Sequence, residues 1–131
     1  ILFIIRFARP VPVSRDNPRA NIKTMQKSTE ILNKGTALFI WPEHCSVKEG
    51  VGEFMSGFEY IGKYYYQKTG KKISFYPVFT SKKKKTMYIE KPIVYNPDND
   101  PNEEKTRIVT YLHDEMEKSY LEHEKNKQMK K

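Results

Sequence analysis

The stretch Thr36–Ser46 restricts the fold of this chain more than any other part of the sequence. Its apolar residues, 37–41, follow one another without alternation and end at Pro42. A parallel strand that is buried on both faces has this pattern, and a proline cannot donate to the next rung of a sheet. The sequence therefore predicts a buried strand over 37–41. Glu43 and His44 follow its carboxyl end, which is where open α/β sheets place their ligand sites.

The segment before this strand has clear helix signals. Asn17 caps a helix start, Pro18 suits its first position, and Gly35 is placed for a left-handed end. These residues predict a helix over about 18–33, between an extended segment at 11–14 and the buried strand. Strand, helix, strand in this order favours a right-handed parallel crossover. The predicted fold class is α/β, with a mixed, largely parallel sheet and flanking helices.

The rest of the chain alternates short apolar segments with turns. The predicted elements are a helix over about 54–68 that stops near Gly70, a strand over 73–80 interrupted by Pro77, short strands over 87–90 and 93–95, and a last helix opened by Asp100-Pro101. We expect a single domain over 1–131, with a disordered tail at 123–131. The start at Ile1, inside an apolar run, favours a truncated N-terminus.

Charge points to anionic partners. The chain has 24 Lys and Arg against 16 Asp and Glu, a net charge of +8. Such a balance suits nucleic acid, an acidic membrane surface or phosphorylated substrates. Lys82–Lys85, with Lys71 and Lys72, suit acidic headgroups, although a solvated hairpin tip explains them equally well. The single cysteine excludes an internal disulfide, and no segment has the roughly 20 apolar residues of a spanning helix.

Four short segments share their order and spacing with the blocks of one enzyme family. Val13-Ser14-Arg15 resembles a block that ends a strand with an arginine, and Leu38–Glu43 resembles a Phe-Pro-Glu block with tryptophan in place of phenylalanine. Phe54 and Gly57 match the element that follows it, and Phe75–Val78 resembles a last strand with a proline. On these segments the chain resembles the glycerolipid acyltransferases, the lysophosphatidic-acid and glycerol-phosphate acyltransferase superfamily.

The resemblance implies an enzyme of phospholipid synthesis that moves a fatty acyl group from acyl-CoA or acyl-carrier protein to a lysophospholipid or glycerol phosphate. It implies substrate-binding roles for Arg15 and Glu43, and His44 is expected to bind substrate with them because it follows the same strand end. The Arg15 guanidinium would bind the acceptor's phosphate, and the Glu43 carboxylate would orient acceptor hydroxyls or brace Arg15. No metal or organic cofactor is expected. The expected location is the cytoplasmic face of a membrane with an anionic surface, reached peripherally or through an upstream anchor.

The catalytic block of the family, a histidine and an aspartate separated by four residues, is missing from this sequence, so no catalytic residue is expected in this chain. His44, Cys45 and Ser46 also replace the family's Gly-Thr-Arg. Alternatives therefore stay open: a non-catalytic relative of the family, or a basic module that binds membranes or nucleic acid. Nucleic acid is not an expected partner, because no helix gathers Lys and Arg on one face. Arg15 as a surface ion-pair partner and Glu43 as an ordinary loop carboxylate are the simpler roles for these two residues.

Overall fold

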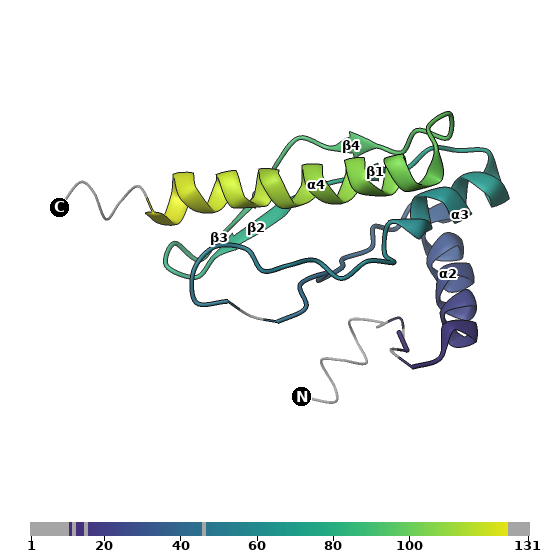
Figure 1. Ribbon diagram of the computed structural model, residues 1–131, viewed down its shortest axis with the longest axis horizontal. Helices are drawn as coiled ribbons and strands as arrows, with labels where there is room; N and C mark the ends of the chain where they lie inside the picture. The colour runs from purple at the N-terminus through teal and green to yellow at the C-terminus, as the bar shows by residue number, and fades with distance from the viewer. Residues whose placement is uncertain (1–10, 12, 15, 46, 126–131) are drawn as a thin grey trace. The chain divides into compact units, whose positions relative to one another are not determined.

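The computed structural model describes residues 11, 13–14, 16–45 and 47–125 (Figure 1). The chain forms two compact units, and their boundary in the sequence lies between Phe39 and Ile40. Among the described residues, the first unit contains one helix. The second contains two α-helices, a short π-helical turn and four short strands.

Helix α2, Pro18–Asn33, is the helix of the first unit, and it has the predicted bounds. The Asn17 side chain accepts a hydrogen bond from the Arg19 amide at 3.1 Å, which satisfies one of the free donors of the first turn. Gly35 follows the helix with φ of +80°, the left-handed conformation expected of a glycine there. The predicted helix over 18–33 is confirmed.

The second unit contains helices α3, Tyr60–Thr69, and α4, Pro101–Tyr120, and α4 continues into the π-helical turn η1, Leu121–Lys125. The Asp100 side chain caps α4 by accepting from two amides of its first turn. Helix α3 starts later than the predicted position 54, because Gly57 has a φ of +122° that a helix does not accommodate. Gly70 ends α3 in the left-handed conformation, as predicted. The predicted tail at 123–131 begins inside η1, and 126–131 lie outside the described residues.

The four strands form one interrupted antiparallel hairpin. Strand β1, Ser74–Phe75, pairs with β4, Ile93–Val94, and strand β2, Val78–Ser81, pairs with β3, Thr86–Ile89. Between the two pairings, residues 76–77 lie opposite residues 90–92, so the returning strand has one residue more. This mismatch is a bulge. The Glu90 amide donates to the Pro77 carbonyl at 2.9 Å, so the additional residue lies in the segment 91–92, opposite Tyr76.

The core of the second unit lies between this hairpin and helix α4. Its buried apolar residues are Ile93, Tyr95, Ile108 and Leu112, and partly buried aromatic rings pack against them. In strands β1 and β4, successive side chains alternate between the core and the solvent. Phe75 and Ile93 point toward the core, whereas their neighbours Ser74 and Val94 are exposed.

The predicted mixed, largely parallel sheet is wrong. Among the described residues the strands form two small antiparallel sheets of two strands each. The segment 37–41 forms no strand, and it exposes large apolar side chains, with Trp41 82% exposed. An apolar run predicts a buried strand only if other elements cover it on both sides. The strands pair with close neighbours in sequence instead, across the short turn at 82–85, which closes a small loop at low entropic cost.

Gly62 on α3 tests how tightly this helix packs on the hairpin. A Cβ at this position would lie 2.9 Å from Cδ2 of the buried Tyr95 ring. We expect Gly62→Ala to lower the free energy of unfolding by about 1 kcal/mol, because an overpacking cost of about 1–3 kcal/mol exceeds a helix-propensity gain of about 1 kcal/mol. Urea unfolding measures the change, with the exposed Gln67→Ala as control. A stabilised Gly62→Ala would show that this contact is loose.

Candidate functional site

The loop that contains Glu43 folds back on itself. Glu43 and Phe54 form an antiparallel bridge. The His44 amide donates to the Glu53 carbonyl at 2.9 Å, and the Met55 amide donates to the Pro42 carbonyl at 2.7 Å. Glu43 therefore lies at the base of a closed turn over 42–55, rather than beyond the end of a parallel strand.

The Glu43 carboxylate is fixed inside this turn. Its Oε2 accepts a hydrogen bond from the Gly52 amide at 3.0 Å. A Cβ at Gly52 would lie 2.8 Å from the Cys45 carbonyl oxygen and 3.1 Å from Oε2 of Glu43, so the close approach requires a glycine. The half-buried carboxylate thus has a defined direction, which a binding role for a hydroxyl group would need.

Helix α4 holds the same turn from the other side. Oε2 of Glu117 accepts a hydrogen bond from the Val51 amide at 2.9 Å. The Phe54 ring meets the His113 ring edge-on, with centroids 5.2 Å apart. These contacts join residues that are far apart in sequence, so the turn is tied to the longest helix of its unit.

Aromatic rings connect three of the segments that resemble the acyltransferase blocks. Phe54 meets Phe58 edge-on at 6.3 Å between centroids, and Phe58 meets Phe75 in the same way at 6.4 Å. Since Phe54 is bridged to Glu43, the turn, the residues around Gly57 and strand β1 form a continuous contact path. This packing brings together segments that the sequence treats as separate motifs.

Of the other two predicted binding residues, the structure describes His44 alone. His44 is exposed, and so is its neighbour Cys45. Arg15 lies outside the described residues, and so does Ser46. The predicted convergence of Arg15 and Glu43 on one phosphorylated acceptor therefore stays a prediction, and so does the binding role of His44.

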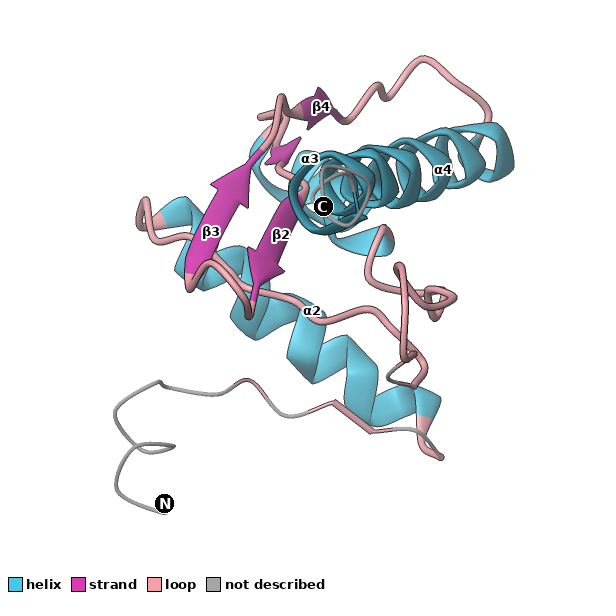
Figure 2. Cartoon of the chain, turned by 90° about the vertical axis from the view of Figure 1, so that its left-hand side faces the viewer, coloured by secondary structure: helices cyan, strands magenta, loops and turns pink. Residues whose placement is uncertain are grey.

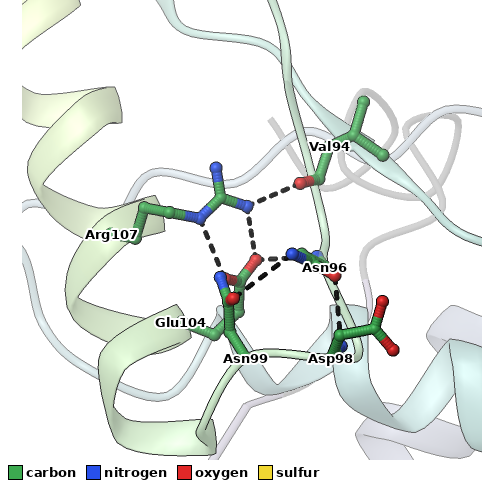
Figure 3. A network of polar contacts seen from close by, with 6 residues as sticks. All are labelled: Val94, Asn96, Asp98, Asn99, Glu104 and Arg107. Carbon is green, nitrogen blue, oxygen red and sulfur yellow. Dashed lines mark hydrogen bonds and ion pairs between the residues drawn. The ribbon is translucent and has the colours of Figure 1, made fainter.

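A second polar cluster surrounds Glu104, in the first turns of α4 (Figure 3). The Glu104 residue is only 2% exposed. Its carboxylate accepts from Nε of Arg107 at 2.9 Å, from the Asn96 amide at 2.8 Å and from Nδ2 of Asn99 at 2.6 Å. Arg107 also donates to the Val94 carbonyl at 2.7 Å, which links α4 to the end of β4. Every charge in the cluster is compensated, as a buried ion pair requires.

These contacts change the acidity of the buried carboxyl group. Hydrogen bonding from Arg107 is the main cause that lowers the pKa of Glu104 from 4.5 to about 2, and the Asn96 and Asn99 donors lower it further against the opposing effect of burial. The same bond raises the pKa of Arg107. A carboxylate that stays ionised and fully bonded in this way is a structural clamp rather than a proton donor.

A small pocket lies beside this cluster, between the start of α3 and the first turns of α4. Glu59, Tyr95, Glu104 and Lys105 are among the residues that line it. The Glu59 side chain is 2% exposed, its Oε2 accepts from the Gly57 amide at 2.7 Å, and its Oε1 lies 3.6 Å from Nζ of Lys105. This ion pair ties the two helices together.

No group of three or more His, Cys, Asp or Glu side chains in the described part of the chain is arranged to hold a metal ion. Within the same residues, no helix is both long enough and apolar enough to span a bilayer.

The Glu104 cluster was not expected from the sequence. In the sequence, Glu103 and Glu104 are two acidic residues near the start of the last helix, where a negative charge is common at any helix start. The available signal was the i, i+3 spacing of Glu104 and Arg107, which places the two side chains on one face of the helix. That spacing does not reveal burial, because burial depends on how the turn at 96–99 folds over α4.

No protein-family model matches this sequence, and comparison with curated proteins and with solved structures returns no significant match. The chain's function must therefore be argued from its own residues and their geometry.

Proposed function

We propose that this chain is the acceptor-binding part of a glycerolipid acyltransferase. The enzyme would transfer a fatty acyl group from acyl-CoA or acyl-carrier protein to a lysophospholipid or glycerol phosphate, at the cytoplasmic face of a membrane. The main observation in support of this proposal is the contact path from Glu43 through Phe54 and Phe58 to Phe75. It joins three segments whose order in the sequence resembles the family's blocks, although the strands of the described residues pair in an antiparallel way.

Glu43 would orient the acceptor's hydroxyl groups. A carboxylate accepts hydrogen bonds from hydroxyls, and it does so with defined geometry only if it is itself held in place. The Gly52 amide supplies that support, and Glu117 and His113 hold the turn against α4. Arg15 would bind the phosphate through the planar, two-pronged donor set of a guanidinium. His44 would line the same site from its exposed position next to Glu43.

The chemical step needs a base that removes the proton of the attacking hydroxyl. In the resemblance this base is the histidine of the missing block, held in its tautomer by an aspartate. The chain by itself is therefore expected to bind the acceptor without transferring acyl groups. Measurable acyl transfer by the purified chain, from acyl-CoA to glycerol 3-phosphate, would contradict this division of roles.

Arg15→Ala tests the phosphate site. We expect it to weaken binding of glycerol 3-phosphate by about 10- to 100-fold, because a hydrogen bond to a charged group contributes about 1.5–3 kcal/mol. Calorimetric titration of the purified chain measures this affinity, and glycerol 3-phosphate is soluble enough to avoid any effect of lipid surfaces. The matched control is Arg19→Ala, which removes the same charge from an exposed position on α2.

Glu43→Gln distinguishes the hydroxyl-binding role of Glu43 from the phosphate-binding role of Arg15. Glutamine keeps an oxygen that can accept from the Gly52 amide, so the turn is preserved while the charge is lost. We expect weaker binding of glycerol 3-phosphate and little change for inorganic phosphate, which has no glycerol hydroxyls. If Arg15→Ala and Arg19→Ala bind glycerol 3-phosphate equally well, the phosphate role of Arg15 is refuted.

A further inference from the structure

We propose that the β2–β3 hairpin docks the chain onto an anionic membrane, with its outer face against the lipid and its lysine tip against the headgroups. The outer face consists of Val78, Thr80, Met87 and Ile89. The lysine tip is the turn Lys82–Lys85. Figure 2 shows the two strands side by side, next to α4.

The outer face is mostly apolar, and three of its four residues are exposed. Val78 pairs with Ile89 and Thr80 pairs with Met87, so the four side chains lie on one side of the two-stranded sheet. Met87 is 52% exposed and Ile89 is 64% exposed. Exposed apolar residues that are grouped on one face, rather than scattered, indicate a surface that another phase or molecule covers.

The opposite face of the hairpin is fixed to α4 and η1. The Phe79 ring meets Tyr120 edge-on, and the Tyr88 ring stacks on His123 with centroids 3.6 Å apart. The Ser81 hydroxyl donates to Glu124, whose carboxylate lies 3.7 Å from Nζ of Lys83. The outer face is therefore preformed, and docking would require no folding of the hairpin.

Charge near this apolar face identifies what covers it. The segment 71–95 contains seven lysines and one acidic residue, a net charge of +6 out of the chain's +8. The single acid, Glu90, accepts a hydrogen bond from Ser119 and so turns toward α4. Four of the lysines form the tip, where Lys82 and Lys85 are exposed and Lys83 pairs with Glu124. An apolar face that ends in a cationic tip complements an anionic bilayer, where lysines meet phosphates and apolar side chains enter the interface.

The composition favours a lipid surface over nucleic acid. The segment 71–95 contains no arginine, which is the side chain best suited to two-pronged recognition of phosphate or base edges. The aromatic rings of strands β2 and β3 are not available for base stacking, since Phe79 packs against Tyr120 and Tyr88 stacks on His123. Tyr76, just before β2, is 56% exposed, and an amphipathic tyrosine ring also suits a membrane interface. Lysine ammonium groups beside aliphatic side chains can bind a charged lipid surface, which requires no recognition of a particular sequence or shape.

The proposed membrane docking depends on this surface alone. Its purpose, access to a lipid acceptor, rests on the proposed function. Arg15→Ala and Glu43→Gln should leave vesicle binding unchanged, because neither residue belongs to the hairpin. If the parent chain binds vesicles but does not bind glycerol 3-phosphate, the acceptor site is refuted and the docking surface is not. If the parent chain binds glycerol 3-phosphate but does not bind vesicles that contain phosphatidylserine, the docking surface is refuted and the acceptor site is not.

The test is co-sedimentation of the purified chain with vesicles of phosphatidylcholine, with and without phosphatidylserine. We expect binding only to the vesicles that contain phosphatidylserine. The double variant Lys82→Gln/Lys85→Gln should lower the partition coefficient by about thirtyfold, since each lysine near an anionic surface contributes about fivefold. The matched control, Lys23→Gln/Lys27→Gln, removes the same charge from exposed positions on α2 and should bind nearly as well as the parent.

The apolar face has its own variants. Ile89→Ser should lower the partition coefficient by about tenfold, while an unchanged thermal unfolding midpoint would show that the hairpin is still folded. Ile89→Trp in a Trp41→Phe background should show a blue-shifted fluorescence maximum with phosphatidylserine vesicles. The proposed docking face is wrong if the fluorescence maximum of the Ile89→Trp variant does not shift with these vesicles. It is also wrong if Lys23→Gln/Lys27→Gln lowers the partition coefficient as much as Lys82→Gln/Lys85→Gln does. Binding to single-stranded RNA as tight as to the vesicles, and insensitive to Ile89→Ser, would also overturn it.

Discussion

Replacing Glu104 with glutamine is expected to lower the free energy of unfolding by about 3 kcal/mol at neutral pH. The carboxylate is buried and accepts bonds from Arg107, Asn96 and Asn99. A glutamine keeps the volume, yet it offers one acceptor oxygen and turns a donor toward groups that are themselves donors. Breaking a buried ion pair costs about 3–5 kcal/mol, and we expect the lower end because Arg107 is partly exposed.

The pH dependence of stability provides an independent readout of this cluster. The pKa of Glu104 is lowered from 4.5 to about 2, so the folded state favours the ionised carboxyl. The stabilising effect of the ionised Glu104 is complete when the pH is above its ordinary pKa of 4.5. It is lost as the pH falls through the lowered pKa of about 2. The parent chain should thus lose about 3 kcal/mol between these two pKa values, and Glu104→Gln should lose far less.

Urea titrations at a series of pH values measure both effects. Glu103→Gln is the matched control, because Glu103 lies in the same helical turn but is exposed. Its loss should stay below about 1 kcal/mol, the size of a charge effect at a helix start. Equal losses for the two glutamates would show that the cluster around Glu104 contributes nothing special to stability.

Ile108→Ala is expected to destabilise the second unit by about 3–4 kcal/mol. Ile108 is 1% exposed and belongs to the buried cluster with Ile93, Tyr95 and Leu112. Truncation removes three buried carbons and leaves a cavity between α4 and the hairpin, and such changes cost about 2–5 kcal/mol in well-packed cores. The gain in helix propensity from alanine is only a few tenths of a kcal/mol and does not change the sign.

The graded variant Ile108→Val should cost about 1 kcal/mol, because it removes a single methyl group. Thr110→Ala, at an exposed position on the same helix, should have an effect within about 0.5 kcal/mol. Urea unfolding compares all three. If Ile108→Ala costs no more than Ile108→Val, the region around Ile108 collapses freely and is not the rigid centre of this unit.

Local signals in the sequence predicted the helices well. Asn17 with Pro18, and Asp100 with Pro101, start helices because their capping bonds involve only the next two or three residues. Gly35 and Gly70 mark helix ends because few other residues adopt a positive φ without strain. The late start of α3 followed from a third such glycine, at position 57, whose conformation the sequence alone did not reveal.

Long-range features were predicted poorly. The apolar run at 37–41 was interpreted as a buried strand, but an apolar run does not reveal whether anything covers it, and Trp41 is exposed. For Glu43, the sequence placed the residue correctly after the run but gave the wrong setting, since the partner across the bridge is Phe54. Glu104 was missed because its burial depends on a turn that folds over α4. In each case the deciding contact joins residues that local patterns do not relate.

The bulge of the hairpin allows the loss of one residue but not of two. Residues 90–92 exceed their partners 76–77 by one, and Ile93 lies opposite Phe75 on the inward face. Deleting residue 91 or 92 would remove the bulge and leave this pairing in place, so that the hairpin would lose the additional twist that a bulge introduces. Deleting both residues would instead place Val94 opposite Phe75 and turn Ile93 into water.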